Sequence, residues 1–214
     1  MQNHFAVDAS EDAIVESKVT PAHVRAARHV SNMLAPAPVS LPLVALVALY
    51  HAQNVPLALL YALLTLFFLS IGPLIYILIA IHMGKISDID ISRRTERAGP
   101  FLFGISSVLA GWLALIILHG PRDLQTVLII TAVSGIVMMV TTLWWKISIH
   151  ASSMGGAATI LTSFYGAVML PTFLLVILVS WSRVVLGRHT VLQVVAGSLV
   201  SIALTLLILK VRGI

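Results

Sequence analysis

The chain has 214 residues, of which 59% are hydrophobic and 10% are charged, and its mean hydropathy is +1.03. Soluble domains carry roughly 25% charged residues, so this composition excludes a soluble globular protein and indicates an integral membrane protein. The absence of cysteine excludes disulfides, thiol catalysis and thiolate metal sites. The net charge of +5 comes without a basic tract interleaved with aromatic residues, so no nucleic-acid partner is expected.

The N-terminal part of the chain is polar. Residues 1–19 mix acidic and basic side chains, which predicts a polar tail, and they lack the pattern of a signal peptide. Thr20-Pro21 has the form of a helix start, a capping residue followed by proline at the first helical position. Residues 20–35 then combine His and Arg with Val, Ala and Met, which predicts an amphipathic helix lying in the membrane interface.

Residues 36–214 are predicted to form the transmembrane domain, because apolar runs alternate there with short polar segments. The runs cover residues 36–50, 56–81, 100–118, 124–145, 153–181 and 190–209. A spanning helix needs about 20 residues, so we predict an all-α integral membrane protein with six to seven transmembrane helices. The second run should bend at Gly72-Pro73. Pro171, which follows Gly166, favours a break of residues 153–181 into two helices.

Three polar segments, residues 85–97, 146–152 and 182–193, separate these runs. Two apolar runs lie between the first and the second segment, so both should emerge on the same face of the membrane. The third joins them only if residues 153–181 form two helices; otherwise it lies on the opposite face and no common site exists. On one face the segments would gather the side chains of Arg93, Arg94, Arg97, Lys146, Ser148, His150, Arg183, Arg188 and His189.

Such a cluster has the parts that phosphoryl transfer needs. Arginine and lysine bind phosphate oxygens, while one histidine can attack phosphorus and another can protonate the leaving oxygen. If the chain is helical from Thr190, His189 and Gln193 are four residues apart and their side chains can touch. Nothing in this chemistry needs a metal, and no cofactor is expected.

The third polar segment resembles a motif of the membrane-bound type 2 phosphatidic acid phosphatases, whose superfamily includes the vanadium-dependent haloperoxidases. The motif in that family is Ser-Arg, five residues, His, three residues and Asp. Here Ser182-Arg183 is followed at the same spacing by His189 and then by Gln193.

The other two family motifs are matched less closely. The second is Pro-Ser-Gly-His, and its counterpart here is Ile147-Ser148-Ile149-His150. The first is Lys, six residues and Arg-Pro, for which residues 93–100 are a loose counterpart. The order of the motifs and their alternation with apolar runs match the family from residue 36 to the end of the chain.

The resemblance implies a role for each of these residues. His189 would be the nucleophile that forms a phosphohistidine, oriented by Gln193, and His150 would be the acid for the leaving group and then the base for water. The residues implied in phosphate binding are Arg183, Ser148, Ser182, Lys146 and one or more of Arg93, Arg94 and Arg97.

Two departures from the family pattern bear on these roles. Gln193 replaces an aspartate; its amide oxygen can still fix the His189 tautomer, but it cannot stabilise an imidazolium by charge. A different carboxylate, from Asp88, Asp90 or Glu96, is the alternative. Gly99 stands where the family has an arginine before proline.

A site at the membrane surface favours a lipid phosphate as substrate. Phosphatidic acid, phosphatidylglycerol phosphate and polyprenyl diphosphates all fit, and the sequence does not separate them or give the oligomeric state. With seven spans, the face of the site holds all Lys and Arg residues except Arg122, Lys210 and Arg212. The positive-inside rule then places the site in the cytoplasmic face of the cell membrane.

The same residues also fit structural roles and other functions. His150 could be an interfacial histidine, and the arginines at 93–97 could be only a topology signal that pairs with nearby acids. Asp88-x-Asp90 raises an intramembrane prenyltransferase, although that class needs a second acidic loop. A non-catalytic lipid-phosphate binding or transport protein is the other rival, which predicts polar or broken spans near the midplane.

Overall fold

The computed structural model describes residues 21–50, 52–91 and 93–214. The predicted polar tail, residues 1–19, lies outside these residues. Within them the secondary structure is helical and contains no strand, so the prediction of an all-α protein is confirmed.

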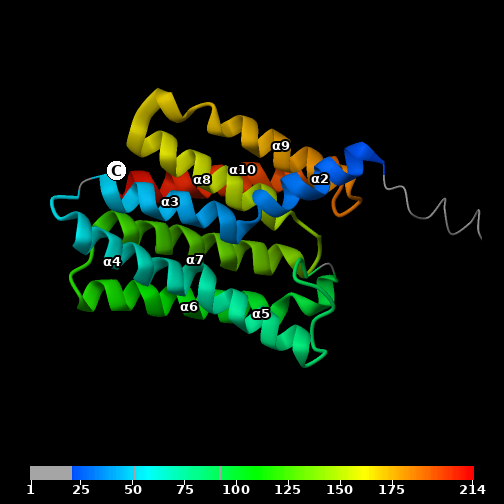
Figure 1. Ribbon diagram of the computed structural model, residues 1–214, viewed down its shortest axis with the longest axis horizontal. Coiled ribbons are helices and arrows are strands. Elements are labelled where there is room, and N and C mark those ends of the chain that lie inside the picture. The colour runs from blue at the N-terminus through cyan, green and yellow to red at the C-terminus, as the bar shows by residue number, and fades with distance from the viewer. Residues whose placement is uncertain (1–20, 51, 92) are drawn as a thin grey trace, which may run out of the picture.

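The helices follow the apolar runs of the sequence and lie side by side, with the C-terminus at one end of the bundle and α2 at the other (Figure 1). In chain order they are α2 Ala22–Met33, α3 Pro36–Tyr50, α4 Val55–Leu66, the π-helical turn η1 Phe67–Ile71, α5 Gly72–His82, the 3₁₀ turn η2 Arg94–Glu96, α6 Ala98–Ile117, α7 Arg122–Thr142, α8 Ile149–Tyr165, the 3₁₀ turn η3 Gly166–Met169, α9 Thr172–Val185 and α10 Val191–Arg212.

The length and composition of these helices make this a multi-pass membrane protein. Among the described residues four helical segments can cross a membrane, and a fifth exists if α2 and α3, bent by 45°, form one span. The four are Val55–His82, Arg94–Ile117, Arg122–Thr142 and Val191–Arg212. Since α8 and α9 have only 17 and 14 residues, six spans are reached only if two of the helices α3, α8 and α9 also cross, and seven only if all three do.

Next to Gly72-Pro73, where the sequence predicts a bend, the structure has the π-helical turn η1. Proline has no N–H and its ring crowds the carbonyl of the preceding turn, which disturbs the regular hydrogen-bond ladder. The Gly72 N–H donates to the Phe67 carbonyl, five residues back. The neighbouring Phe68 carbonyl accepts a hydrogen bond from Ser107 Oγ at 2.7 Å. The helix therefore continues through the proline within one span.

The predicted break in residues 153–181 is present between α8 and α9. Gly166 has φ +75°, a conformation that is easy only for glycine, and it ends α8. Pro171 precedes the first residue of α9. Because two helices rather than one lie between the second and third polar segments, all three segments reach the same end of the bundle, which we call the site end.

Small residues bring α8 and α10 into close contact. A Cβ atom added to Gly197 would lie 2.7 Å from the Ser148 carbonyl oxygen, and one added to Gly156 would lie 2.8 Å from Ser201 Oγ. Close packing through small residues is typical of helix pairs in membranes. This contact holds the start of α8, which carries the second motif, against the start of α10, which follows the third.

Candidate active site

The connections at the site end are joined by hydrogen bonds between segments that are far apart in the sequence. Arg97 Nη1 donates to the Ile147 carbonyl at 3.3 Å, which ties the start of α6 to the α7–α8 connection. The Ser148 N–H donates to the Gln193 carbonyl at 3.3 Å, which ties the same connection to α10. These contacts bring the counterparts of all three motifs together.

The turn between α9 and α10 explains the spacing of the third motif. The Arg183 carbonyl accepts hydrogen bonds from the N–H groups of Arg188, at 3.0 Å, and of His189, at 3.3 Å. Gly187, within the turn, has φ +64°. The backbone thus folds back on itself, and the side chains of Arg183 and His189 both line one cavity.

His189 is held by the first turn of α10. Thr190 caps the helix, and the Gln193 side-chain oxygen accepts from the Thr190 N–H at 3.2 Å in a capping box. The same oxygen lies 3.1 Å from His189 Nδ1. Because this oxygen can only accept, Nδ1 carries the hydrogen and Nε2 keeps a free electron pair. The contact expected from the i, i+4 spacing therefore forms, and it selects the tautomer that suits a nucleophile.

The His189 ring is neutral at neutral pH. The pKa of His189 is lowered to about 4, mainly by burial and also by the positive charge of Arg183, whereas the hydrogen bond with Gln193 acts in the opposite direction. The side chain is 7% exposed. A neutral imidazole is the form that can attack phosphorus.

His150 lies in the first turn of α8. Ser148 caps this helix, with its Oγ accepting from the Ala151 N–H at 3.4 Å. The His150 side chain is buried, and its Nε2 atom has no hydrogen-bond partner within the described parts of the chain. A buried polar atom without a partner calls for an explanation, such as a ligand.

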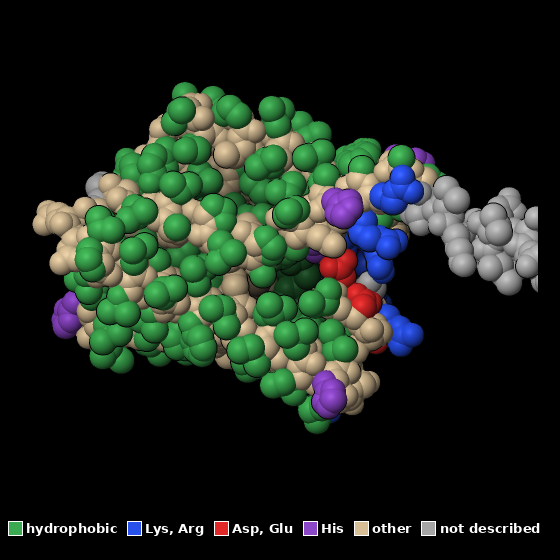
Figure 2. All heavy atoms as spheres, viewed as in Figure 1, with side chains coloured by type: hydrophobic (Ala, Val, Ile, Leu, Met, Phe, Trp, Pro, Cys, Tyr) green, Lys and Arg blue, Asp and Glu red, His purple; other side chains and the backbone are tan. Residues whose placement is uncertain are grey.

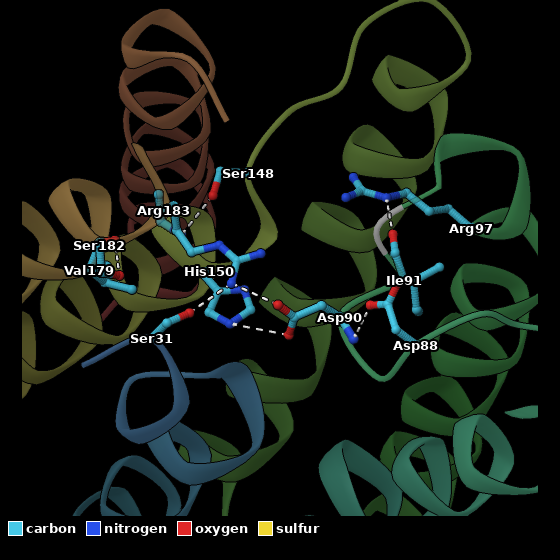
Figure 3. Close-up of polar contacts among 11 residues, drawn as sticks. Ser31, Asp88, Asp90, Ile91, Arg97, Ser148, His150, Val179, Ser182 and Arg183 are labelled. Atoms are coloured by element: carbon cyan, nitrogen blue, oxygen red, sulfur yellow. Dashed lines mark hydrogen bonds and ion pairs between the residues drawn. The ribbon is translucent and has the colours of Figure 1, made fainter. Parts of the chain in front are cut away.

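Arg183 is the most deeply buried cation in the cavity, together with Arg97. Its Nη1 donates to Asp90 Oδ2 at 2.8 Å and to Ser31 Oγ of α2 at 2.7 Å. Its Nε is buried and has no partner among the residues described. Figure 3 shows these side chains converging from α2, the loop after α5, α8 and α9.

The structure separates the arginines of the first polar segment. Arg97 is 3% exposed, lines the cavity and donates from Nε to the Ile91 carbonyl at 3.1 Å. Arg93 and Arg94 are exposed, and Arg93 pairs with Glu96 at 3.4 Å. Of the three candidates, Arg97 is the member that reaches the site.

Three further phosphate-binding candidates, Ser148, Ser182 and Lys146, do not line the cavity. Ser148 is buried and its side chain caps α8. Ser182 is buried, but its Oγ donates to the Val179 carbonyl of its own helix at 2.7 Å and so turns away from the site. Lys146 is partly buried. Burial lowers its pKa, and the charges of Arg97 and Arg188 lower it further, because Lys146 lies near the cations of the site.

The cavity has a volume of about 550 Å³ and two chemically different parts. Its polar part holds Asp90, Arg97, His150, Arg183 and His189. The remaining walls come from α3, η1, α5 and α6 and are mostly apolar, including Pro36, Leu69, Pro73, Ile77 and Phe101. Figure 2 shows a hollow in the apolar surface beside the charged side chains of the site end.

Asp90 is the site residue whose place the sequence did not predict. It was one of three acids considered as an orienting carboxylate for His189, but its Oδ2 pairs with Arg183 and its Oδ1 lies 4.0 Å from His150 Nε2. Burial raises the pKa of Asp90, but the charge and hydrogen bond of Arg183 outweigh this effect, so the pKa is lowered overall. The feature of the sequence that could have indicated this place is the pair Asp88 and Asp90 within the otherwise basic first polar segment, residues 85–97.

The other two acids are also engaged elsewhere. Asp88 Oδ1 accepts from the Asp90 N–H at 3.0 Å. Glu96 accepts from the N–H and the Oγ of Ser87, both at 2.8 Å. None of these three hydrogen bonds involves His189.

Comparison with known proteins finds one matching family. A family model described as the PAP2 superfamily matches residues 131–213, which include the second and third motifs. The resemblance seen in the sequence is thereby confirmed, and it supports a phosphatase-type hydrolase function. No curated protein and no solved structure matches the chain.

Proposed function

We propose that this membrane protein, in which residues 131–213 match the family model of the PAP2 superfamily, removes phosphate from a membrane lipid through a phosphohistidine at His189. The observation that carries this proposal is the convergence of His150, Arg183 and His189 on one cavity from separate segments of the chain. The buried Nε2 of His150 and Nε of Arg183 have no partner within the described residues, so both nitrogens are available to a ligand.

In the first step the His189 Nε2 electron pair attacks phosphorus. The bond from phosphorus to the leaving oxygen breaks, and the protonated form of His150, which the negative charge of the bound phosphate favours, gives its proton to that oxygen. Arg183 and Arg97 balance the negative charge on the remaining phosphate oxygens, as preorganised cations do in phosphoryl transfer. The product of this step is a phosphohistidine.

In the second step water replaces histidine on phosphorus. His150, now neutral, takes a proton from water while the water oxygen attacks phosphorus. The bond between nitrogen and phosphorus breaks, which restores neutral His189 and releases inorganic phosphate. All groups needed for both steps are side chains of this protein, so the proposed reaction uses no metal.

The form of the cavity supports a lipid as substrate. Its cationic part fits a phosphate group, and its apolar walls from α3, α5 and α6 fit a hydrocarbon chain. Phosphatidic acid, phosphatidylglycerol phosphate and a polyprenyl diphosphate each combine these two features. The prenyltransferase alternative is less favoured, because Asp90 is paired with Arg183 rather than facing a second acidic loop.

The test is phosphate release from these three kinds of lipid, in detergent and with EDTA, by wild type, His189→Ala, His150→Ala and His82→Ala. His82 is an exposed histidine at the end of α5 and serves as the matched control. We expect release by wild type and His82→Ala, and loss in the other two variants.

Each other result has a distinct meaning. Full activity of His189→Ala rules out the proposed nucleophile, and release only with added magnesium rules out the metal-free reaction. No release from any lipid favours a binding or transport protein.

A further inference from the structure

The Asp90 carboxylate occupies the cationic part of the cavity. Its Oδ2 is 2.8 Å from Arg183 Nη1, and its Oδ1 is 4.0 Å from His150 Nε2. Figure 3 shows the carboxylate pointing from the loop after α5 toward both side chains. One oxygen thus faces the proposed phosphate-binding arginine and the other faces the proposed general acid.

This is the arrangement that two oxygens of a phosphate group would need. A bound phosphate would place one oxygen on Arg183 and its leaving oxygen near His150. With Asp90 in place, the incoming phosphate would meet a carboxylate whose lowered pKa keeps it negative, and like charges at such a short distance repel each other. Asp90 and phosphate therefore compete for the same groups.

The loop that carries Asp90 is held in an unfavourable backbone conformation. Ile91 has φ +47°, which is rare and unfavourable for a β-branched residue. Its buried side chain packs against Ile86 and Ala80, and its carbonyl accepts from Arg97 Nε. Strained residues of this kind are typical of segments that change conformation at functional sites.

We propose that Asp90 is a specificity determinant that competes with phosphate for Arg183 and His150. This inference rests on the proposed function. A phosphate group must displace the carboxylate, so free inorganic phosphate binds weakly. A lipid phosphate gains additional binding from its tail in the apolar part of the cavity, and this offsets the displacement. After hydrolysis the carboxylate returns to Arg183 and favours release of the phosphate product.

The first test measures the affinity for inorganic phosphate by calorimetry in detergent at pH 7, for wild type, Asp90→Asn and Asp123→Asn. Asp123 lies in the first turn of α7, at the end of the bundle away from the site, and its substitution is the matched control. Removing the competing charge should tighten phosphate binding by roughly tenfold in Asp90→Asn, the effect of about one pKa unit. The control should bind like wild type.

The outcomes separate this inference from the proposed function. If wild type hydrolyses lipid phosphates but Asp90→Asn binds phosphate no more tightly, only the competition is overturned. A fall in kcat of Asp90→Asn with unchanged phosphate affinity also overturns it, because it would make Asp90 a partner of His150. If Asp90→Asn gains affinity and no lipid is hydrolysed, the competition stands and the phosphatase function fails.

A second measurement needs no variant. Hydrogen exchange of the backbone amides in residues 84–91 is followed in wild type without phosphate and with saturating phosphate. Displacement of Asp90 should free this loop and make its exchange faster when phosphate is bound. Unchanged or slower exchange would show that phosphate binds without moving the carboxylate, which overturns the proposal.

Discussion

Gln193 is the residue that decides how His189 is held. Its side-chain oxygen serves both the helix cap and the imidazole, so one contact stabilises the start of α10 and fixes the tautomer of the proposed nucleophile. The family has aspartate at this position, which would also add a negative charge. The amide leaves the pKa of His189 at about 4, so the ring stays neutral over most of the pH range.

Gln193→Glu should change the pH dependence of the reaction. The added charge is expected to raise the pKa of His189. Since the neutral ring is the reactive form, activity is present above this pKa and is lost as the pH falls through it. Activity in wild type should therefore persist until the pH approaches 4, whereas activity in the variant should fall at higher pH.

The measurement is the ratio of kcat/KM, variant over wild type, on one lipid phosphate between pH 7 and pH 5. The ionisation of the substrate cancels in this ratio. We expect the ratio to fall as the pH is lowered, and a constant or rising ratio would contradict the account. Gln125→Glu is the control, because the Gln125 side chain contacts the Gly120 carbonyl rather than a histidine.

The contacts of single residues were predictable where they are local. The spacing of His189 and Gln193 on a helix predicts their contact, because residues four apart share a face. The pairing of Asp90 with Arg183 joins residues 93 positions apart, and no local pattern indicates it. Which arginine of the first segment turns inward depends on the path of a loop, so the sequence left that choice open.

At the scale of helices, the packing of α10 on α8 positions the proposed acid. Gly197 lies so close to the Ser148 carbonyl that a Cβ would come within 2.7 Å of it. Ser148 caps the helix that carries His150. A displacement of α10 should therefore be transmitted through the backbone to the side chain of His150.

Gly197→Ala is expected to lower both stability and activity. The added methyl group meets backbone rather than a flexible side chain, and overpacking of this kind costs about 1–3 kcal/mol. The thermal unfolding midpoint in detergent should fall, and kcat should fall because the first turn of α8 is shifted. Gly104→Ala in α6 is the matched control, because a Cβ there meets nothing within 4 Å. Equal behaviour of the two variants would contradict this account.

The arrangement of helices was largely predictable because its signals are local. The break between α8 and α9 depends on Gly166 and Pro171, residues with known backbone preferences. Because two helices then separate the second polar segment from the third, all three segments lie at the same end of the bundle. The form of the irregularity before Pro73 was not predictable, because a proline can kink a helix or be absorbed in a π-helical turn. Packing with Ser107 of α6 accompanies the second outcome here.

For the whole molecule, the distribution of charge distinguishes the two ends of the bundle. The Lys and Arg side chains in the described residues lie at the site end, except for Arg122, Lys210 and Arg212. Under the positive-inside rule this asymmetry favours a cytoplasmic site. Several of these cations form the proposed phosphate site and would be needed there in either orientation of the protein. The orientation in the membrane therefore needs its own test.

Labelling of single cysteines tests the orientation directly, because the chain contains no cysteine. Arg94→Cys places an exposed thiol at the site end, and Lys210→Cys places one near the other end of α10. In intact cells a membrane-impermeant maleimide should react with Lys210→Cys and spare Arg94→Cys until the cells are opened. The reverse pattern would place the site on the outer face.

The central claim is that phosphate passes through His189, and the most direct measurement is the location of the phosphoryl group during turnover. His150→Ala removes the acid of the first step and the base that activates water in the second. A polyprenyl diphosphate is therefore the lipid used, because its phosphate leaving group departs with little help from an acid, so the variant slows mainly the hydrolysis of the intermediate. The variant is mixed with lipid phosphate, quenched under alkaline denaturing conditions that preserve the bond between nitrogen and phosphorus, and mapped by peptide mass spectrometry. The account predicts one phosphoryl group on His189. A phosphoryl group on another residue, or hydrolysis of the lipid with no modified peptide in either wild type or variant, would contradict it.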